Sequence, residues 1–222
     1  MHGTRRIAHG AVALVLLAGT LAAQGGEEAR ERWQRVPEIF AALGVGPGVR
    51  VADIGAGGGF FTARLARAVG NDGRVFAVDV DAAVIGRLEQ RAAREPWSNV
   101  DIIHSRRDDP RLPHGVLDAA LIVNAYHEFT DVEAMLRGLA RALKPGGRLV
   151  IVDQVPPSGR LRSERSAQER AHELGSWFAV RDLLVADFRI VRLEDPFIVA
   201  ESADARGEWW LLVAVRGAEP AR

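Results

Sequence analysis

An aspartate followed by a run of glycines marks residues 51–65, where the sequence reads VADIGAGGGFFTARL. Four of the five residues from Gly55 to Gly59 are glycine. Glycine allows a tight turn and lets a ligand approach the main chain, because it has no Cβ. The carboxylate of Asp53, two positions ahead, would repel phosphate groups and attract a cationic amino group. The segment therefore favours a nucleotide-like ligand that carries an ammonium group and no pyrophosphate.

The main alternative for such a loop is a dinucleotide site, which requires the pattern G-x-G-x-x-G. When the pattern starts from Gly55 and Gly57, the third glycine position falls on the bulky Phe60. The chain fits D-x-G-x-G-x-G better, with Asp53 ahead of Gly55, Gly57 and Gly59. This difference opposes a nicotinamide-dependent oxidoreductase, which remains a less favoured hypothesis.

The rest of the chain alternates short apolar runs with amphipathic ones, which is typical of a parallel sheet with helices on both faces. Strands are predicted at 50–54, 74–80, 100–105, 117–125 and 148–154. Helices are predicted at 27–43, 61–69, 82–94, 132–143 and near 179–186, with a polar, arginine-rich connector at 156–170. Two last strands, at 188–199 and 208–216, predict a hairpin that adds an antiparallel edge. With no internal repeat or linker, residues 27–216 are predicted to form a single domain.

Four segments occur in an order that resembles a known family. They are VADIGAGGGFFT, VFAVDVD, LDAALIVNAYHEF and ALKPGGRLVIVD. From about Val49 to Arg216 the chain is similar to the class I S-adenosylmethionine-dependent methyltransferases. The resemblance implies an α/β, doubly wound, mostly parallel seven-stranded sheet in the order 3-2-1-4-5-7-6. It also implies S-adenosyl-L-methionine as cofactor. No proline pair follows Asn124 and the chain has no cysteine, which leaves a small-molecule oxygen, nitrogen or carbon acceptor.

The resemblance assigns cofactor contacts by position. Asp53 would lie near the methionine ammonium group, and Asp79 would accept both ribose hydroxyls, although Asp79 could instead cap the helix that begins near Asp81. The place where the family often has an adenine-binding acid falls on Arg106, so Asp108 is the candidate there, with a solvated loop carboxylate as the alternative. The full set of expected cofactor contacts is Asp53, Gly55, Ala56, Gly57, Gly59, Phe60, Asp79, Val80, Asp108 and Asn124.

The segment VNAYHEF would face the methyl acceptor in this family's fold, which makes Tyr126, His127 and Glu128 the catalytic candidates. His127 could take a proton, because the pKa of histidine lies near neutrality. Glu128 could orient His127 or bind a cationic group. The alternative for His127 is that it caps the next helix or packs on the cofactor. His172 is a further candidate, because related methyltransferases often have a histidine in a comparable region, although a surface helix position would also explain it.

Composition excludes several classes of function. Lysine plus arginine equals aspartate plus glutamate, 29 against 29, so no basic field favours nucleic acid as a partner. The absence of cysteine excludes thiolate metal sites and cysteine nucleophiles. The six histidines show no i, i+4 pair typical of a helix-borne zinc site, so no metal is predicted.

The first residues resemble a secretory signal, with Arg5 and Arg6 ahead of the apolar run AVALVLLAGTLAA at 11–23. We therefore expect residues 1–23 to be a leader that makes at most transient membrane contact, and the protein to be exported; otherwise it would be cytoplasmic. Export also sustains a second hypothesis of function. Since S-adenosylmethionine is made in the cytosol, an exported chain could be a catalytically inactive module that binds it.

Overall fold

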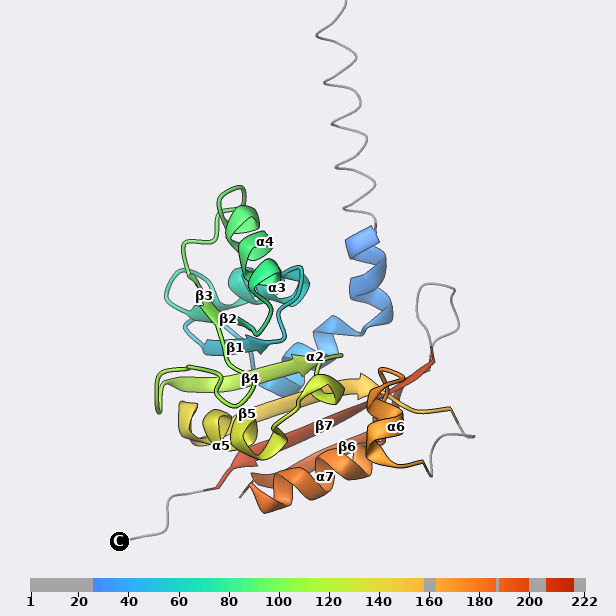
Figure 1. The fold of residues 1–222 in the computed structure, drawn as a ribbon. Helices are drawn as coiled ribbons and strands as arrows, with labels where there is room; N and C mark the ends of the chain where they lie inside the picture. Colours follow the sequence, from blue (N-terminus) through green and yellow to red (C-terminus); the bar gives the residue numbers. More distant parts are fainter. Residues whose placement is uncertain (1–25, 158–162, 187, 200–206, 218–222) are drawn as a thin grey trace, which may run out of the picture.

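A seven-stranded sheet forms the centre of the protein, which we describe from a computed structural model (Figure 1). The structure describes residues 26–157, 163–186, 188–199 and 207–217. The strands are β1 (Arg50–Ile54), β2 (Arg74–Asp79), β3 (Val100–His104), β4 (Leu117–Val123), β5 (Leu143–Gln154), β6 (Phe188–Val199) and β7 (Glu208–Arg216). Their order is β3-β2-β1-β4-β5-β7-β6, and β7 runs antiparallel to both of its neighbours. The predicted fold, strand order and antiparallel hairpin are confirmed.

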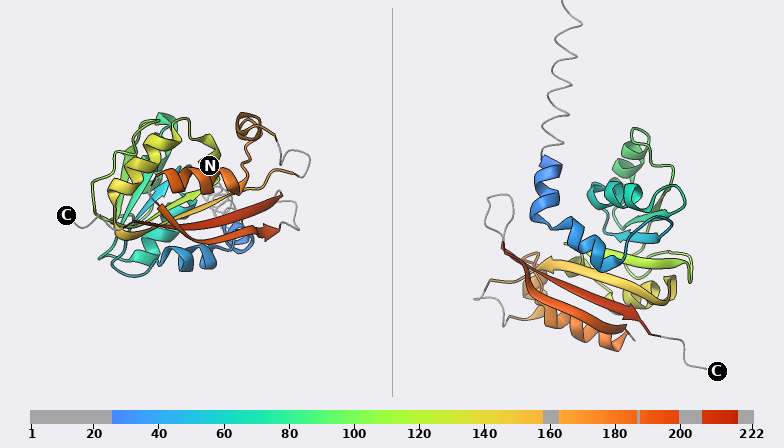
Figure 2. Two further views of the ribbon diagram at one scale, coloured as in Figure 1. Left: turned by 90° about the horizontal axis from the view of Figure 1, so that it is seen from below. Right: turned by 180° about the vertical axis from the view of Figure 1, so that it is seen from behind.

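Helices cover both faces of the sheet, as the left view of Figure 2 shows. They are α2 (Val36–Leu43), α3 (Phe60–Val69), α4 (Ala82–Ala92), α5 (Val132–Ala142), α6 (Arg165–Glu169) and α7 (Ser176–Val185), with a 3₁₀ turn, η1 (Tyr126–Glu128). Residues 26–33 are also helical. The helices α3, α4, α5 and α7 each pack against a strand that they connect, whereas α6 lies against η1.

The alternation of side chains along each strand divides the core into two layers. In β5, Leu149 and Ile151 pack in a cluster with buried side chains of α5 and α7. Val150 and Val152 point to the other face, where they join α2 and α3. All four side chains are almost completely buried, which explains why the central strands read as continuous apolar runs.

The predicted helix at 27–43 is wrong in one respect, because the chain turns at Gln34 and Arg35 and divides it in two. Arg35 adopts a left-handed conformation with φ 53°, and Pro37 lies in the first turn of α2. Proline has no N–H to donate and its ring collides with the preceding helical turn. A new helix, α2, therefore begins here, and the helix at residues 26–33 cannot continue past Arg35. The predicted connector at 156–170 likewise contains the short helix α6.

The predicted leader at 1–23 lies outside the described residues. Within the described part of the chain, no helix has the length and apolar character needed to cross a membrane.

The central strand β4 provides a test of this packing. Leu121 is completely buried, so we expect Leu121→Ala to lower the free energy of unfolding by about 2–5 kcal/mol through lost burial and the cavity left behind. Leu184→Ala is the matched control, because Leu184 is 59% exposed and surface changes usually cost less than about 0.5 kcal/mol. Urea unfolding measures both. Equal losses for the two variants would contradict the proposed core.

Candidate active site

A cavity of about 590 Å³ opens at the carboxyl ends of β1, β2 and β4. Between β1 and β4 the strand order changes direction, and open α/β sheets bind ligands at such a point. The cavity is lined by Ile54, Gly55, Gly57, Val78, Asp79, Val80, Asp81, Val84, Ser105, Arg106, Arg107, Asn124, Ala125, Glu128, Phe129, Thr130 and Met135. Five of the expected cofactor contacts are therefore in its wall, namely Gly55, Gly57, Asp79, Val80 and Asn124.

The glycine segment bends sharply where β1 ends. Gly55 and Gly57 have φ values of 72° and 54°, which L-residues with a side chain rarely adopt. The N–H groups of Gly55 and Ala56 both donate to the carbonyl oxygen of Val78 in β2, at 2.9 and 3.0 Å. A Cβ on Gly55 would lie 2.5 Å from the Cβ of Ala125, which follows β4. Only glycine fits at this junction.

Asp79 ends β2 with its carboxylate at the cavity wall. Its Oδ2 accepts a hydrogen bond from the N–H of Gly57 at 3.0 Å, and its Oδ1 accepts one from the N–H of Asp81 at 3.0 Å. The alternative role for Asp79 as a helix cap is wrong, because the side chain of Asp81 caps α4 and accepts from Ala83 and Val84. The carboxylate of Asp79 is thus held at the glycine bend, beside the space where a ligand would lie.

Asp53 does not line the cavity. It is 3% exposed, and its Oδ2 accepts a hydrogen bond from the hydroxyl of Thr62 in α3 at 2.6 Å. Burial raises the pKa of Asp53 to about 6, against the opposing effect of the hydrogen bonds from Thr62. The structure therefore joins Asp53 to α3, and its expected place near the ammonium group of the cofactor stays a prediction.

The other expected cofactor contacts are not part of the cavity wall. Ala56 and Phe60 are buried, and the guanidinium groups of Arg30 and Arg64 lie 4.1 and 3.7 Å from the centre of the Phe60 ring. Gly59 precedes α3 as its N-terminal cap residue. Asp108 is exposed and absent from the cavity wall. The side chains that line the wall after β3 are instead Ser105, Arg106 and Arg107.

His127 is fixed by Asp153 at the end of β5. The Nδ1 atom of His127 lies 2.9 Å from one carboxylate oxygen of Asp153 and 3.1 Å from the other, and the backbone N–H of His127 also donates to Asp153. A carboxylate only accepts, so Nδ1 carries a proton and Nε2 of the neutral ring keeps its lone pair. Burial lowers the pKa of His127, but Asp153 and the nearby Glu128 and Glu169 outweigh it and raise that pKa overall.

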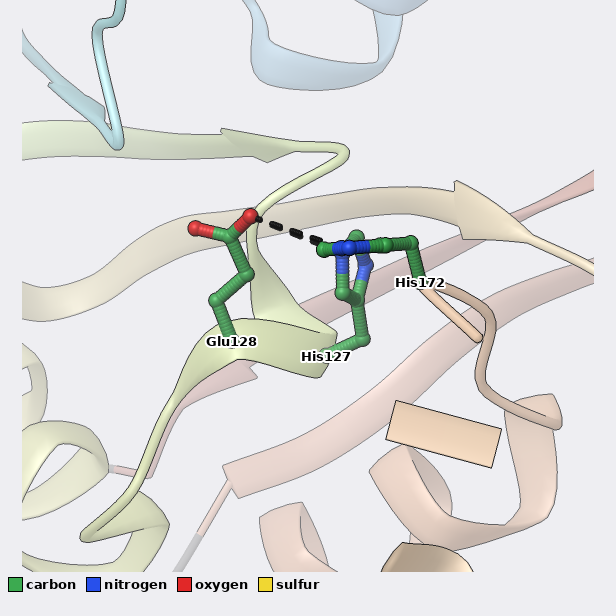
Figure 3. Close-up of side chains that lie close together, drawn as sticks. All are labelled: His127, Glu128 and His172. Atoms are coloured by element: carbon green, nitrogen blue, oxygen red, sulfur yellow. Dashed lines mark ion pairs between the residues drawn. The ribbon is translucent and has the colours of Figure 1, made fainter. Parts of the chain in front are cut away.

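Three candidate side chains converge beside the cavity. Figure 3 shows His127 and Glu128 extending from η1 toward His172, which lies in the turn after α6. Oε1 of Glu128 lies 3.8 Å from Nε2 of His127 and 3.9 Å from Nδ1 of His172. The two imidazole rings meet edge to face, with their centres 5.5 Å apart. Glu128 also lines the cavity, so this cluster borders the ligand space.

Tyr126 does not face the ligand space, contrary to the prediction. Its side chain is completely buried, its ring packs against Phe129, and its hydroxyl donates to Asp182 in α7 at 3.1 Å. Burial, together with the charge of Asp182, raises the pKa of the phenol. The reason is the 3₁₀ turn η1, which points successive residues in different directions, so Tyr126 enters the core while Glu128 reaches the cavity.

Asp153 is the residue that the sequence analysis missed. It belongs to the predicted strand at 148–154 and is absent from the expected site residues. The parallel register pairs Val123 of β4 with Val152 of β5. Asp153 therefore lies one residue before the end of β5, beside the segment that contains His127. An acid near the end of a strand that neighbours a candidate histidine is the signal in the sequence.

Comparisons with known proteins agree with this architecture. A family model described as a methyltransferase domain matches residues 51–147. The ubiquinone/menaquinone biosynthesis C-methyltransferase UbiE of Vibrio campbellii (strain ATCC BAA-1116) is 33% identical over 127 residues, which cover 56% of this chain and 48% of that protein. The chain thus spans about half the length of the curated relatives that it matches.

Solved structures share the fold at low sequence identity. A SAM-dependent methyltransferase from Aquifex aeolicus has a TM-score of 0.67 at 22% identity, covering 81% of this chain and 88% of that one. A geranyl diphosphate methyltransferase in complex with SAM has a TM-score of 0.68 at 19% identity, covering 85% and 86%. The strand order and the glycine-lined cavity define a Rossmann-like methyltransferase fold. Residues 51–147 thus match a methyltransferase domain, and the fold is the one found in solved structures of S-adenosylmethionine-dependent methyltransferases.

The Gly55 junction can be tested by adding one methyl group. We expect Gly55→Ala to lower the melting temperature by several degrees, because its Cβ would collide with Ala125 and its φ of 72° disfavours alanine. Gly58→Ala is the matched control, since a Cβ there meets nothing within 4 Å. Thermal unfolding followed by circular dichroism measures both. The tight junction is refuted if the two variants melt together.

The buried carboxyl group of Asp53 should make stability depend on pH. Its folded pKa of about 6 lies above the ordinary value of 3.8, so the stability it contributes is present below pH 3.8 and lost as pH rises through 6. Relative to Asp53→Asn, the wild type should lose up to about 3 kcal/mol between pH 4 and 7, at about 1.4 kcal/mol per pH unit. Urea unfolding across this range measures the difference. A difference that stays constant would contradict the raised pKa.

Proposed function

We propose that this protein transfers a methyl group from S-adenosyl-L-methionine to a small-molecule acceptor. The observation that carries the proposal is the combination in one cavity of a bend that only glycine fits and an acid held against that bend. The match of residues 51–147 to a methyltransferase-domain model supports it as well. When bound, the cofactor supplies an electrophilic methyl group on a positively charged sulfur.

The residues of the cavity fit this cofactor. The volume of about 590 Å³ falls in the range of 300–1,000 Å³ typical of small-molecule sites. Gly55 and Gly57 leave the main chain open to a ligand that lies along it, because neither has a side chain. The carboxylate of Asp79 still has accepting capacity after its two backbone hydrogen bonds, and would accept from the ribose hydroxyls.

The wall formed after β4 is where an acceptor would meet the methyl group. Asn124 and Glu128 line it, and Oδ1 of Asn124 is fixed by a hydrogen bond from Gln154 at 3.0 Å. His127 is held behind Glu128, with its Nε2 directed toward that carboxylate. We assign orientation of the acceptor to Asn124 and Glu128, and its activation to the lone pair of His127.

A hydroxylated aromatic ring is the acceptor class to test first. The curated relatives carry names of C-methyltransferases in ubiquinone and menaquinone biosynthesis. Deprotonating a ring hydroxyl makes both the oxygen and the adjacent ring carbons better nucleophiles, so one activating group serves either acceptor atom. Without cysteine in the chain, activation by a thiolate is excluded.

Binding of the demethylated cofactor tests the cavity directly. We expect S-adenosylhomocysteine to bind in isothermal titration calorimetry, and Asp79→Asn to weaken it at least about tenfold, because hydrogen bonds to a charged group contribute about 1.5–3 kcal/mol. Asp72→Asn is the control for a carboxylate in an exposed turn. Binding of NAD(H) but not of S-adenosylhomocysteine would end the methyltransferase proposal, and unchanged affinity in Asp79→Asn would remove Asp79 from the site.

Turnover distinguishes an enzyme from an inactive binding module. With a panel of hydroquinones and catechols, we expect S-adenosylhomocysteine to accumulate only when both S-adenosylmethionine and an acceptor are present. Gly58→Ala should retain this activity, while Gly55→Ala should lose it together with cofactor binding. A chain that binds the cofactor but transfers no methyl group to any member of the panel would favour the inactive module.

A further inference from the structure

The cluster of His127, Glu128 and His172 has the composition and the geometry of a metal site, and we infer that it binds a divalent transition-metal ion, zinc above all. One ligand atom from each residue lies within 4.8 Å of the other two. Two imidazoles and one carboxylate form a known zinc ligand set that leaves a fourth position open. The sequence pattern had predicted no metal.

The buried nitrogen of His127 is the strongest indication of a ligand. The side chain of His127 is only 1% exposed, and its Nε2 is a buried polar atom with no hydrogen-bond partner. Such an atom loses its hydration without compensation, which is unfavourable unless something binds it. The nitrogen is directed toward the space between Glu128 and His172 (Figure 3), so a cation placed there would satisfy it.

Asp153 completes the arrangement that metal-binding histidines usually have. A histidine ligand normally donates its other ring N–H to a carboxylate, which fixes the ring and makes the free nitrogen more basic. Nδ1 of His127 makes this contact with Asp153, which is itself completely buried. Asp153 also accepts from the backbone N–H groups of His127 and Gln154, so its position is determined by three donors.

His172 is held in place by its own turn. It has a φ of 58°, a left-handed conformation that histidine adopts more often than most residues. The next two residues are also fixed, because the N–H of Glu173 donates to the carbonyl of Gln168 and the N–H of Leu174 donates to the carbonyl of Gln154. The second of these hydrogen bonds ties the turn to the end of β5, next to Asp153. The turn therefore brings His172 to η1 from a distant part of the sequence.

Small movements of exposed side chains would close the site. Ligands about 2.0–2.2 Å from a tetrahedral zinc ion lie about 3.4 Å apart, against 3.8 and 3.9 Å here. The side chains of Glu128 and His172 are 62% and 72% exposed, so both can rotate inward while His127 stays fixed. Since Glu128 borders the cavity, the open position of the ion would be available to an acceptor oxygen. With the ion bound, the lone pair of His127 would be a ligand, and the activation assigned to it above would pass to the ion, which makes a bound hydroxyl easier to deprotonate.

Metal titration tests this inference independently of methyl transfer. The full chain is stripped with a chelator, and zinc chloride is titrated by calorimetry in competition with a chelating dye. We expect one tight site per chain, weakened at least about tenfold in His172→Ala and in Glu128→Gln, because changing even a hydrogen-bond partner of a metal ligand typically costs about 10–100-fold in affinity. His114→Ala is the matched control, because His114 is exposed and outside the cluster. Cobalt absorption in the visible range reports the coordination of the same site.

The outcomes distinguish a specific metal site from nonspecific binding of zinc. Both ligand variants replace exposed side chains, so circular dichroism should show that they fold as the wild type does. Equal zinc affinity in the wild type and His172→Ala would mean an adventitious ion only and would overturn the inference, as would the absence of tight binding in the wild type. Zinc binding without S-adenosylhomocysteine binding would contradict the proposed function and leave the metal site standing.

Discussion

The close approach of the β1 and β4 ends is the constraint on which the rest of the structure depends. At Gly55 the main chain passes so near Ala125 that a Cβ would lie 2.5 Å from its neighbour. The contact occurs where the order of strands changes direction, so the two chain segments separate beyond it and leave a cavity. Because Gly55 has no side chain, the ends of β1 and β4 can pack together at the base of the cavity. The glycine bend that follows then lines the cavity.

The same junction sets the direction of the segment that follows β4. After Ala125 the chain enters the turn η1, which places Tyr126 in the core and Glu128 at the cavity. His127 lies between them and is held by Asp153 from the neighbouring strand. The proposed cofactor contacts and the proposed acceptor chemistry would therefore come from adjacent strand ends of one rigid sheet. Rigid positioning of this kind is what an in-line transfer requires, because much of the rate comes from alignment.

The sequence was informative wherever the signal was local. The glycine pattern around Gly55 and the acid at Asp79 could be located because each signal depends on a few adjacent residues. The apolar runs predicted the strands, and the family resemblance implied their order. Contacts between distant segments could not be found in this way. The approach of His172 to Glu128 depends on how the turn after α6 packs against β5, and the burial of Tyr126 depends on a 3₁₀ turn that no periodicity announces. The break at Arg35 could have been anticipated from Pro37.

The most direct test of this account is a crystal structure of the protein grown with S-adenosylhomocysteine. The account predicts density for the ligand along Gly55 and Gly57, with its ribose hydroxyls on the carboxylate of Asp79 and its sulfur facing the wall formed by Asn124 and Glu128. Density for the ligand at another place, or a glycine bend that accepts a pyrophosphate in its stead, would contradict the central claim.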